Sequence, residues 1–212
     1  LETLYLSPYI STIRKYSKAK ICLRAHNVEY EIWERITQNT HFGPKKWYLK
    51  YLTRQLKNYE IDQLSEYDLL AAISQRDLMH FQRLGYQGTA LVVPIGFSIK
   101  DYQPDDHSFT QPLSSGFIGS LDWWPNQEGL DWFLEKVWPL LHAKFPTLEL
   151  HIAGRNTPQN LLELDLPKVT VHGEVDDAQT FINQHSISLV PLFSGSGMRV
   201  KILEAMALGK VV

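Results

Sequence analysis

Short apolar or β-branched runs alternate along the chain with longer amphipathic stretches. A short apolar run bounded by turn residues favours a strand, whereas apolar residues spaced three or four apart favour a helix. Because this alternation is typical of a parallel sheet flanked by helices, we expect an α/β fold. Strands are expected at residues 20–25, 69–73, 91–93, 116–121, 148–153, 169–172 and 187–191. Helices are expected at residues 28–36, from 47 onward, at 75–84, at 126–142, from 176–177, and at 198–208.

The composition changes between Pro94 and Pro112, where Gly, Pro, Asp and Ser replace the periodic pattern. Such residues mark turns and connectors. We therefore expect a linker over residues 96–113 between a first domain, residues 1–95, and a second domain, residues 114–212.

The overall charge excludes some classes of partner. The chain has 21 Lys and Arg against 23 Asp and Glu in 212 residues, a formal charge of −2. Bulk attraction to nucleic acid or to an anionic membrane is therefore not expected, and any bound anion must be held locally. With Cys22 as its single cysteine, the chain has no internal disulfide, which fits a reducing cytoplasm. No apolar stretch approaches the roughly 20 residues of a membrane-spanning helix.

The two ends of the chain predict that it is a piece of a longer protein. The sequence opens at Leu1 without an initiator Met, and residues 210–212 read as the start of a strand. Two incomplete parallel sheets would leave open edges, so we expect the isolated chain to self-associate and to be inactive as an enzyme.

A glycine-rich loop followed by a helix is the most informative segment. It runs from Phe193 through Ser194-Gly195-Ser196-Gly197 into a helix that contains Arg199, Lys201 and Glu204. Glycines allow close approach of a ligand, and a helix N-terminus attracts anions such as a diphosphate. A carboxylate two turns into the helix can accept hydrogen bonds from sugar hydroxyls. Taken alone, the pattern also fits an ordinary glycine turn with solvated charges.

Several motifs resemble glycosyltransferase family 4, a family of retaining enzymes with the GT-B architecture. The stretch Leu-Glu-Ala-Met-Ala at 203–207, within residues 195–209, is similar to the C-terminal-domain motif of that family. Further motifs follow the family order, and they lie at residues 24–29, 73–77, 117–126, 152–155 and 171–177. The resemblance implies a GT-B-like fold with two Rossmann-like domains, both incomplete in this chain.

The resemblance also implies roles for residues of the second domain. Glu204 would hold the donor ribose, and Gly119 would allow a close turn over the diphosphate. Backbone groups of the loop would contact the phosphates and sugar, and residues after the strand at 169–172 would flank the base. The loop residues are Ser196, Gly197 and Met198, and the base residues are Glu174, Val175 and Asp176.

The sequence departs from the family at three positions. Ser196 stands where a second Glu is common, and Ser120 and Asn126 stand where many members have Arg and Lys. We include Asn126 among the donor-binding candidates and expect the cationic contact to come from Arg155, Arg199 and Lys201. The two arginines are favoured because a guanidinium can hold a diphosphate through paired hydrogen bonds.

The catalytic candidates lie in the first domain. His26 follows a strand and can hydrogen-bond an acceptor or donor sugar, although a bond to nearby backbone is an equal alternative. Glu2 lies where the family often has a cleft residue. No residues have metal-ligand spacing, so no metal or other cofactor is expected.

We therefore expect a fragment of a retaining hexosyltransferase of bacterial polysaccharide or glycolipid synthesis. Its partners would be a nucleotide-sugar donor and a glycan or lipid-linked acceptor. The full-length protein would work in the cytoplasm, with peripheral association at the inner face of the membrane. Two alternatives stay open, namely a nucleotide-sugar epimerase of the same architecture and a non-catalytic module that binds a nucleotide sugar or phosphate.

Overall fold

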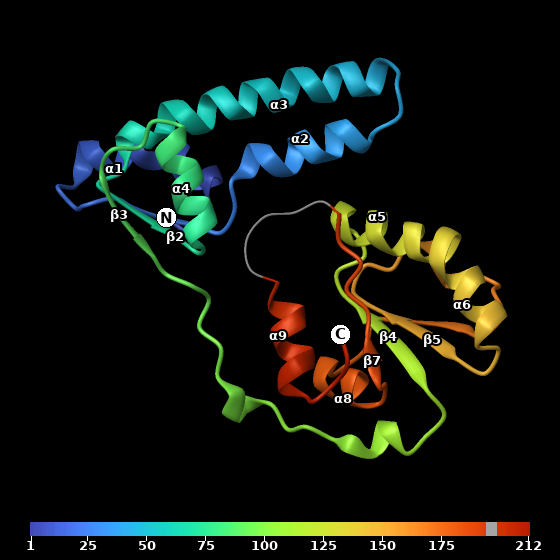
Figure 1. Ribbon diagram of the computed structural model, residues 1–212. Helices are drawn as coiled ribbons and strands as arrows, with labels where there is room; N and C mark the ends of the chain where they lie inside the picture. Colours follow the sequence, from blue (N-terminus) through green and yellow to red (C-terminus); the bar gives the residue numbers. More distant parts are fainter. Residues whose placement is uncertain (194–198) are drawn as a thin grey trace. The chain divides into compact units, whose positions relative to one another are not determined.

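The computed structural model describes residues 1–193 and 199–212, and the chain divides into two compact units (Figure 1). The first unit contains residues 1–96. The second contains residues 97–193 and 199–212. Each unit is built on its own parallel sheet with helices packed against it, which is the α/β fold that the alternating pattern predicts.

In the first unit, the parallel sheet has the order β1-β2-β3. Its strands are β1 (Cys22–Ala25), β2 (Leu69–Ala72) and β3 (Thr89–Val92). Its helices are η1 (Leu4–Tyr9), α1 (Ile10–Tyr16), α2 (Glu29–Asn39), α3 (Pro44–Gln63), η2 (Leu64–Glu66) and α4 (Gln75–Arg83). The core lies between the sheet and these helices, and Leu70 and Phe81 are among its fully buried members.

Local chemistry explains where the helices of this unit begin. The Ser74 hydroxyl accepts a hydrogen bond from the Asp77 amide at 3.1 Å and so caps α4. Pro44 opens α3, where its fixed φ and missing N–H cost nothing. The buried Glu60 carboxylate of α3 accepts bonds from the Glu29 and Tyr30 amides, both at 3.0 Å, and thereby caps α2. In Figure 1, α2 and α3 form a long antiparallel hairpin.

In the second unit, the parallel sheet has the order β6-β5-β4-β7. Its strands are β4 (Ser114–Ile118), β5 (Glu149–Ala153), β6 (Val169–Gly173) and β7 (Ile187–Ser188). Its helices are η3 (Ile99–Asp101), η4 (Asp106–Phe109), α5 (Trp124–Trp132), η5 (Phe133–Val137), α6 (Trp138–Lys144), α7 (Gln159–Leu162), α8 (Ala178–Asn183) and α9 (Val200–Ala207). Phe117, Leu150 and Ile152 are central in its core.

The helix expected over residues 126–142 contains an irregular turn. Helices α5 and α6 join through η5, a π-helical turn in which the Trp138 amide donates to the Phe133 carbonyl five residues earlier. Pro139 has no amide hydrogen, so regular i→i−4 bonding cannot continue through it. Periodicity of apolar residues cannot reveal this change because it leaves the buried face in place.

Residues of the segment 96–113 are anchored to the second unit. Gln179 donates to the Asp101 carbonyl at 3.1 Å, and Ser186 donates to the Ser108 carbonyl at 2.8 Å. The Lys210 ammonium contacts the Asp105 carbonyl and the Ser108 hydroxyl. The turn-rich composition therefore corresponds to a segment that is fixed along one unit, and the predicted boundaries at 95 and 114 stay predictions. Among the described residues, no helix has both the length and the apolar character needed to cross a bilayer.

Candidate functional site

The predicted donor-binding residues follow the strands of the second unit. Gly119 comes directly after β4, Arg155 lies two residues after β5, and residues 174–176 follow β6. Lys201 and Glu204 lie on α9, which follows β7 in the chain. Because parallel strands end at the same edge of a sheet, these loops face the edge at which open α/β sheets bind ligands.

Lys201 is the cationic group that the structure brings to Gly119. Its ammonium donates to the Asn126 side-chain oxygen at 3.0 Å, and Asn126 donates in turn to the Ser120 carbonyl at 2.7 Å. A Cβ atom on Gly119 would collide with the Lys201 ammonium and lie 2.9 Å from the Asn126 amide nitrogen. A side chain at position 119 would therefore displace the Lys201 ammonium and the Asn126 amide from these positions.

Partial burial changes the chemistry of Lys201. The ammonium lies 5.2 Å from the centre of the Phe117 ring, and desolvation lowers the Lys201 pKa to about 8, with Glu204 opposing the shift. Within the described part of the chain, no carboxylate forms an ion pair with this ammonium. A desolvated ammonium that forms no ion pair favours the binding of an anion.

Glu204 is held by a tyrosine that sequence reasoning missed. The Tyr102 hydroxyl donates to Glu204 Oε1 at 3.0 Å, and the Tyr102 ring stacks on Phe97 with centroids 4.7 Å apart. This bond orients the carboxylate that we expect to hold the ribose. Tyr102 lies in the segment expected to be a linker, and nothing in its local sequence indicates a contact with a residue 102 positions later.

The loops after β4 and β5 are joined to one another. A Cβ atom on Gly154 would collide with the Gly119 carbonyl, so the two backbones cross here in van der Waals contact. Asp122 accepts from Ser120 at 2.6 Å and from Asn156 at 3.0 Å, and the Ser120 bond is the main cause of its lowered pKa. The Arg155 side chain is exposed beside these loops, whereas Lys201 occupies the position against Gly119.

The candidate base-binding loop begins at a backbone reversal. Gly173 ends β6 with φ of +71°, a conformation that favours glycine. Glu174 and Asp176 are exposed, and Val175 is half-buried. Asp177 caps α8 by accepting from the Thr180 amide at 2.7 Å, as the adjacent-aspartate pattern predicts.

The remaining donor candidates are at the start of α9. Ser196, Gly197 and Met198 lie outside the described residues, so their expected phosphate and sugar contacts stay predictions. Arg199 is half-buried and occupies the N-cap position of α9, directly before Val200.

Glu2 and His26 meet in the first unit. The Leu1 ammonium donates to the Cys22 carbonyl at 2.7 Å and the Arg24 amide donates to the Leu1 carbonyl at 2.8 Å, which is a parallel pairing with β1. Glu2 and His26 consequently lie at the carboxyl end of the sheet. Glu2 Oε2 is 2.8 Å from His26 Nε2, and this hydrogen bond is the main cause of the lowered Glu2 pKa.

The pairing of Glu2 with His26 has a chemical consequence. A carboxylate bonded to one ring nitrogen keeps the proton there and fixes the orientation of the imidazole. The Arg24 guanidinium lies 3.6 Å from the same Glu2 oxygen and adds to the polar character of this edge. Such a group can hold a sugar hydroxyl or accept its proton.

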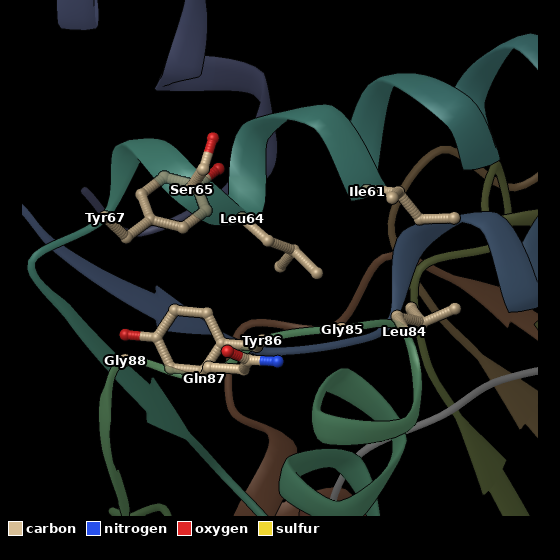
Figure 2. A pocket seen from close by; sticks show the side chains of 9 residues that line it. All are labelled: Ile61, Leu64, Ser65, Tyr67, Leu84, Gly85, Tyr86, Gln87 and Gly88. Atoms are coloured by element: carbon tan, nitrogen blue, oxygen red, sulfur yellow. The ribbon is translucent and has the colours of Figure 1, made fainter.

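A hollow of about 380 Å³ lies elsewhere in the first unit, where the rings of Tyr67 and Tyr86 line it (Figure 2). Both hydroxyls are engaged, Tyr67 with Ser7 at 2.6 Å and Tyr86 with the Thr89 carbonyl at 2.8 Å. Because Tyr67 and Tyr86 precede β2 and β3, the hollow lies at the amino end of the sheet. It is therefore separate from Glu2 and His26.

Three histidines of the second unit also escaped sequence reasoning. His151 and His172 are 2.9 Å apart between ring nitrogens, and His151 stacks on His185 with centroids 4.5 Å apart. Burial lowers the pKa of His185 to about 4, so it is neutral near pH 7. No group of three or more His, Cys, Asp or Glu side chains in the described ranges is arranged to hold a metal ion.

Comparison with known proteins adds the family context. Residues 113–212 match the model of the family described as glycosyl transferases group 1. An uncharacterized 44.6 kDa protein in the cps region of Klebsiella pneumoniae is 26% identical over 214 residues, which cover 94% of this chain and 53% of that protein. The chain thus spans about half the length of this curated relative.

Solved structures show a similar fold. TarM is 13% identical with a TM-score of 0.71, and the match covers 99% of this chain and 39% of TarM. The α,α-trehalose 6-phosphate synthase of Burkholderia multivorans is 13% identical with a TM-score of 0.59, covering 96% of this chain and 52% of that enzyme. The chain therefore has the α/β fold of GT-B glycosyltransferases, and its second unit matches the group 1 glycosyltransferase family model.

Proposed function

We propose that the whole protein is a retaining glycosyltransferase that moves a hexose from a nucleotide diphosphate sugar to an acceptor hydroxyl. The observation that carries this proposal is the set of Gly119, Lys201 and Glu204 at the ligand-binding edge of the unit that matches the family. One similar structure concerns "enzymatic glycosyltransfer with retention" by trehalose-6-phosphate synthase, and another such enzyme from E. coli is bound with UDP-2-fluoro glucose. These neighbours support retention and a nucleotide-sugar donor.

In the proposed reaction, the bond between the anomeric carbon and the diphosphate oxygen breaks, and the diphosphate keeps the electron pair. The acceptor oxygen forms the new bond to that carbon on the same face and passes its proton to the departing diphosphate oxygen, which lies on that face. Positive groups fixed near the leaving oxygen lower the barrier because negative charge develops there. Lys201 and Arg199 supply these groups, with Arg155 at the rim of the site. The N-terminus of α9 adds its partial positive charge.

The nucleotide half of the donor is assigned to two carboxylate-bearing segments. Glu204, oriented by Tyr102, accepts hydrogen bonds from the ribose hydroxyls. Residues Glu174–Asp176 flank the base beyond β6. Asn126 fixes the Lys201 ammonium through its 3.0 Å hydrogen bond and so positions the cation. Ser196, Gly197 and Met198 complete the phosphate and sugar contacts in this proposal.

On the acceptor side, the Glu2–His26 pair binds the acceptor or donor sugar. No metal or other cofactor is part of the proposed mechanism. A relative in a cps region supports a role in polysaccharide synthesis, with a glycan or lipid-linked acceptor in the cytoplasm at the inner membrane face. We expect the isolated chain to bind donor without turnover and to self-associate through sheet edges.

Calorimetric titration of the chain with UDP, GDP and their glucose and mannose conjugates tests the donor site. One nucleotide should bind, and Glu204→Ala and Lys201→Met should each weaken it at least about tenfold. Matched controls are Glu163→Ala, an exposed carboxylate after α7, and Lys168→Met, which pairs with Glu149 before β6. Both controls should bind as the unmodified chain does. Folded protein that binds no nucleotide, or equal binding by all four variants, would overturn the assignment.

A further inference from the structure

The α2–α3 hairpin carries large exposed aromatic side chains at its tip. Phe42 lies in the turn with 89% of its surface exposed, and Trp47 in the first turns of α3 is 74% exposed. Tyr51 lies one helical turn further and is 59% exposed. Trp47 and Tyr51 share one face of α3 because they are four residues apart. The hairpin tip therefore presents a continuous aromatic surface to its surroundings.

Basic side chains surround this aromatic surface. Residues 44–59 contain five Lys and Arg and no Asp or Glu, in a chain whose formal charge is −2. Lys46, Lys50 and Arg54 line one hollow of about 540 Å³ together with Phe42, Trp47 and Tyr51. The positive charge and the aromatic rings thus belong to the same surface, which we call the hairpin surface.

Packing and hydrogen bonds between α2 and α3 hold the hairpin surface in place. Leu49 and Thr53 are buried on the opposite face of α3, and the Thr53 hydroxyl is 3.1 Å from that of Thr37 on α2. The Lys46 ammonium donates to the carbonyls of Gln38 and Thr40 at 2.9 and 3.0 Å, which ties the start of α3 to the end of α2. The exposed aromatic rings are therefore not part of a loosely packed segment.

We propose that the hairpin surface docks on an anionic phospholipid bilayer. Trp and Tyr rings suit the headgroup region because one end is apolar and the other polar. Lysine and arginine bind anionic lipids there and bury their apolar stems. A second copy of the chain fits less well because its hairpin surface carries the same positive charge. The inference goes beyond the proposed transferase activity, and vesicle binding needs no donor, so either one can fail alone.

Vesicle flotation tests the proposal with two lipid compositions. The chain should bind phosphatidylcholine vesicles that contain phosphatidylglycerol and should bind pure phosphatidylcholine vesicles much more weakly. Binding should fall as salt rises because counterions screen the basic residues. The double variant Lys50→Glu/Arg54→Glu should lose at least about 25-fold in partitioning, since each basic residue near the surface contributes about fivefold.

A second variant separates the aromatic contribution from charge. Trp47→Ser/Tyr51→Ser should reduce binding to both vesicle types while leaving the salt dependence in place. The control Lys144→Glu/Phe145→Ala changes an exposed Lys–aromatic pair of the second unit, in which the ammonium is 5.4 Å from the ring centre. This control should bind vesicles as the unmodified chain does, and circular dichroism should show that all variants are folded.

Any one of three results would overturn the proposal. The first is that the unmodified chain does not float with phosphatidylglycerol vesicles. The second is that both hairpin variants float like the control, and the third is that the control loses as much binding as the hairpin variants do. A particle that becomes smaller in gel filtration when Trp47 and Tyr51 are replaced, with no vesicle binding by the unmodified chain, would show that a second copy covers the hairpin surface.

Discussion

Replacing Lys201 with Met should stabilise the ligand-free chain and weaken nucleotide binding at its anion site. The Lys201 pKa is about 8 in the folded state against an ordinary value of 10.5. That difference corresponds to about 3 kcal/mol by which folding disfavours the charged form. Below pH 8 the ammonium is present in both states, so the full cost applies to the folded state. Methionine has a similar length and no charge, so Lys201→Met should raise the free energy of unfolding at pH 7 by up to about 3 kcal/mol.

The lowered pKa of Lys201 also determines how the stability of the folded chain changes with pH. Between about pH 8 and 10.5 the folded state has released the proton that the unfolded state still holds, so folding becomes more favourable as pH rises. The stability advantage of Lys201→Met over the unmodified chain should consequently shrink across this range. Urea denaturation at pH 7, 8.5 and 10 measures it, and Lys168→Met, an exposed lysine, should show no such trend.

Nucleotide binding should become weaker as pH rises, whereas the stability of the ligand-free chain increases. A diphosphate next to Lys201 favours the ammonium, so binding should draw a proton from solvent at pH 8 and weaken about tenfold between pH 7 and 9. Calorimetry in buffers of different ionisation enthalpy counts this proton, and the ratio of affinities of the unmodified chain and Lys201→Met removes the titration of the nucleotide itself. If this ratio does not change between pH 7 and 9, or if Lys201→Met is less stable than the unmodified chain at pH 7, the assignment of Lys201 is refuted.

Three further predictions concern single contacts. The buried Glu60 carboxyl has its pKa raised to about 7 from 4.5 by burial, so the folded state keeps a proton that the unfolded state has released between these values. Its contribution to stability should fall by about 3 kcal/mol from pH 4.5 to 7.5, and urea denaturation should show this slope in the unmodified chain but not in Glu60→Gln. Tyr102→Phe removes the hydrogen bond to Glu204 and should weaken nucleotide binding about threefold to tenfold in calorimetry with little loss of stability; unchanged affinity would contradict the positioning role. Gly154→Ala should lower the thermal midpoint and destabilise the second unit by about 1–3 kcal/mol because its Cβ meets a backbone carbonyl, whereas Gly96→Ala, with nothing within 4 Å, should be nearly neutral.

The strands were predictable because each is a short apolar run with turn residues at its ends. Each expected strand contains or overlaps an observed one, from β1 within residues 20–25 to β7 within 187–191. The helical segment from η1 to α1 was not expected. Pro8 interrupts its apolar spacing, and its burial depends on contacts such as that between Ser7 and Tyr67, 60 residues away. Local periodicity holds no information on such contacts.

The candidate site was predictable where one helix or one loop carries it. Lys201 and Glu204 are three residues apart, so helical spacing alone places them on one face of α9. The contact between Lys201 and Asn126 joins residues 75 positions apart, and only the sheet order brings them together. For that reason the arginines were favoured over Lys201 from chemistry, while Lys201 is the cation held against Gly119.

Two regions of the chain carry residues that folding alone would not select. At the edge of the second unit, a desolvated ammonium lies against a glycine where any side chain would collide with it. At the tip of the α2–α3 hairpin, Phe42, Trp47 and Tyr51 are exposed although a charged residue would be more soluble there. Each region departs from the pattern that stabilises the rest of its unit, and such departures are expected where a site binds a ligand or a surface. The chemistry also differs between them, since one region holds a half-buried cation that forms no ion pair among the described residues, and the other combines apolar rings with exposed positive charge. A small anionic group satisfies the first, whereas the second requires an extended surface that is both apolar and anionic, and this is why we assign a diphosphate to one and a bilayer to the other.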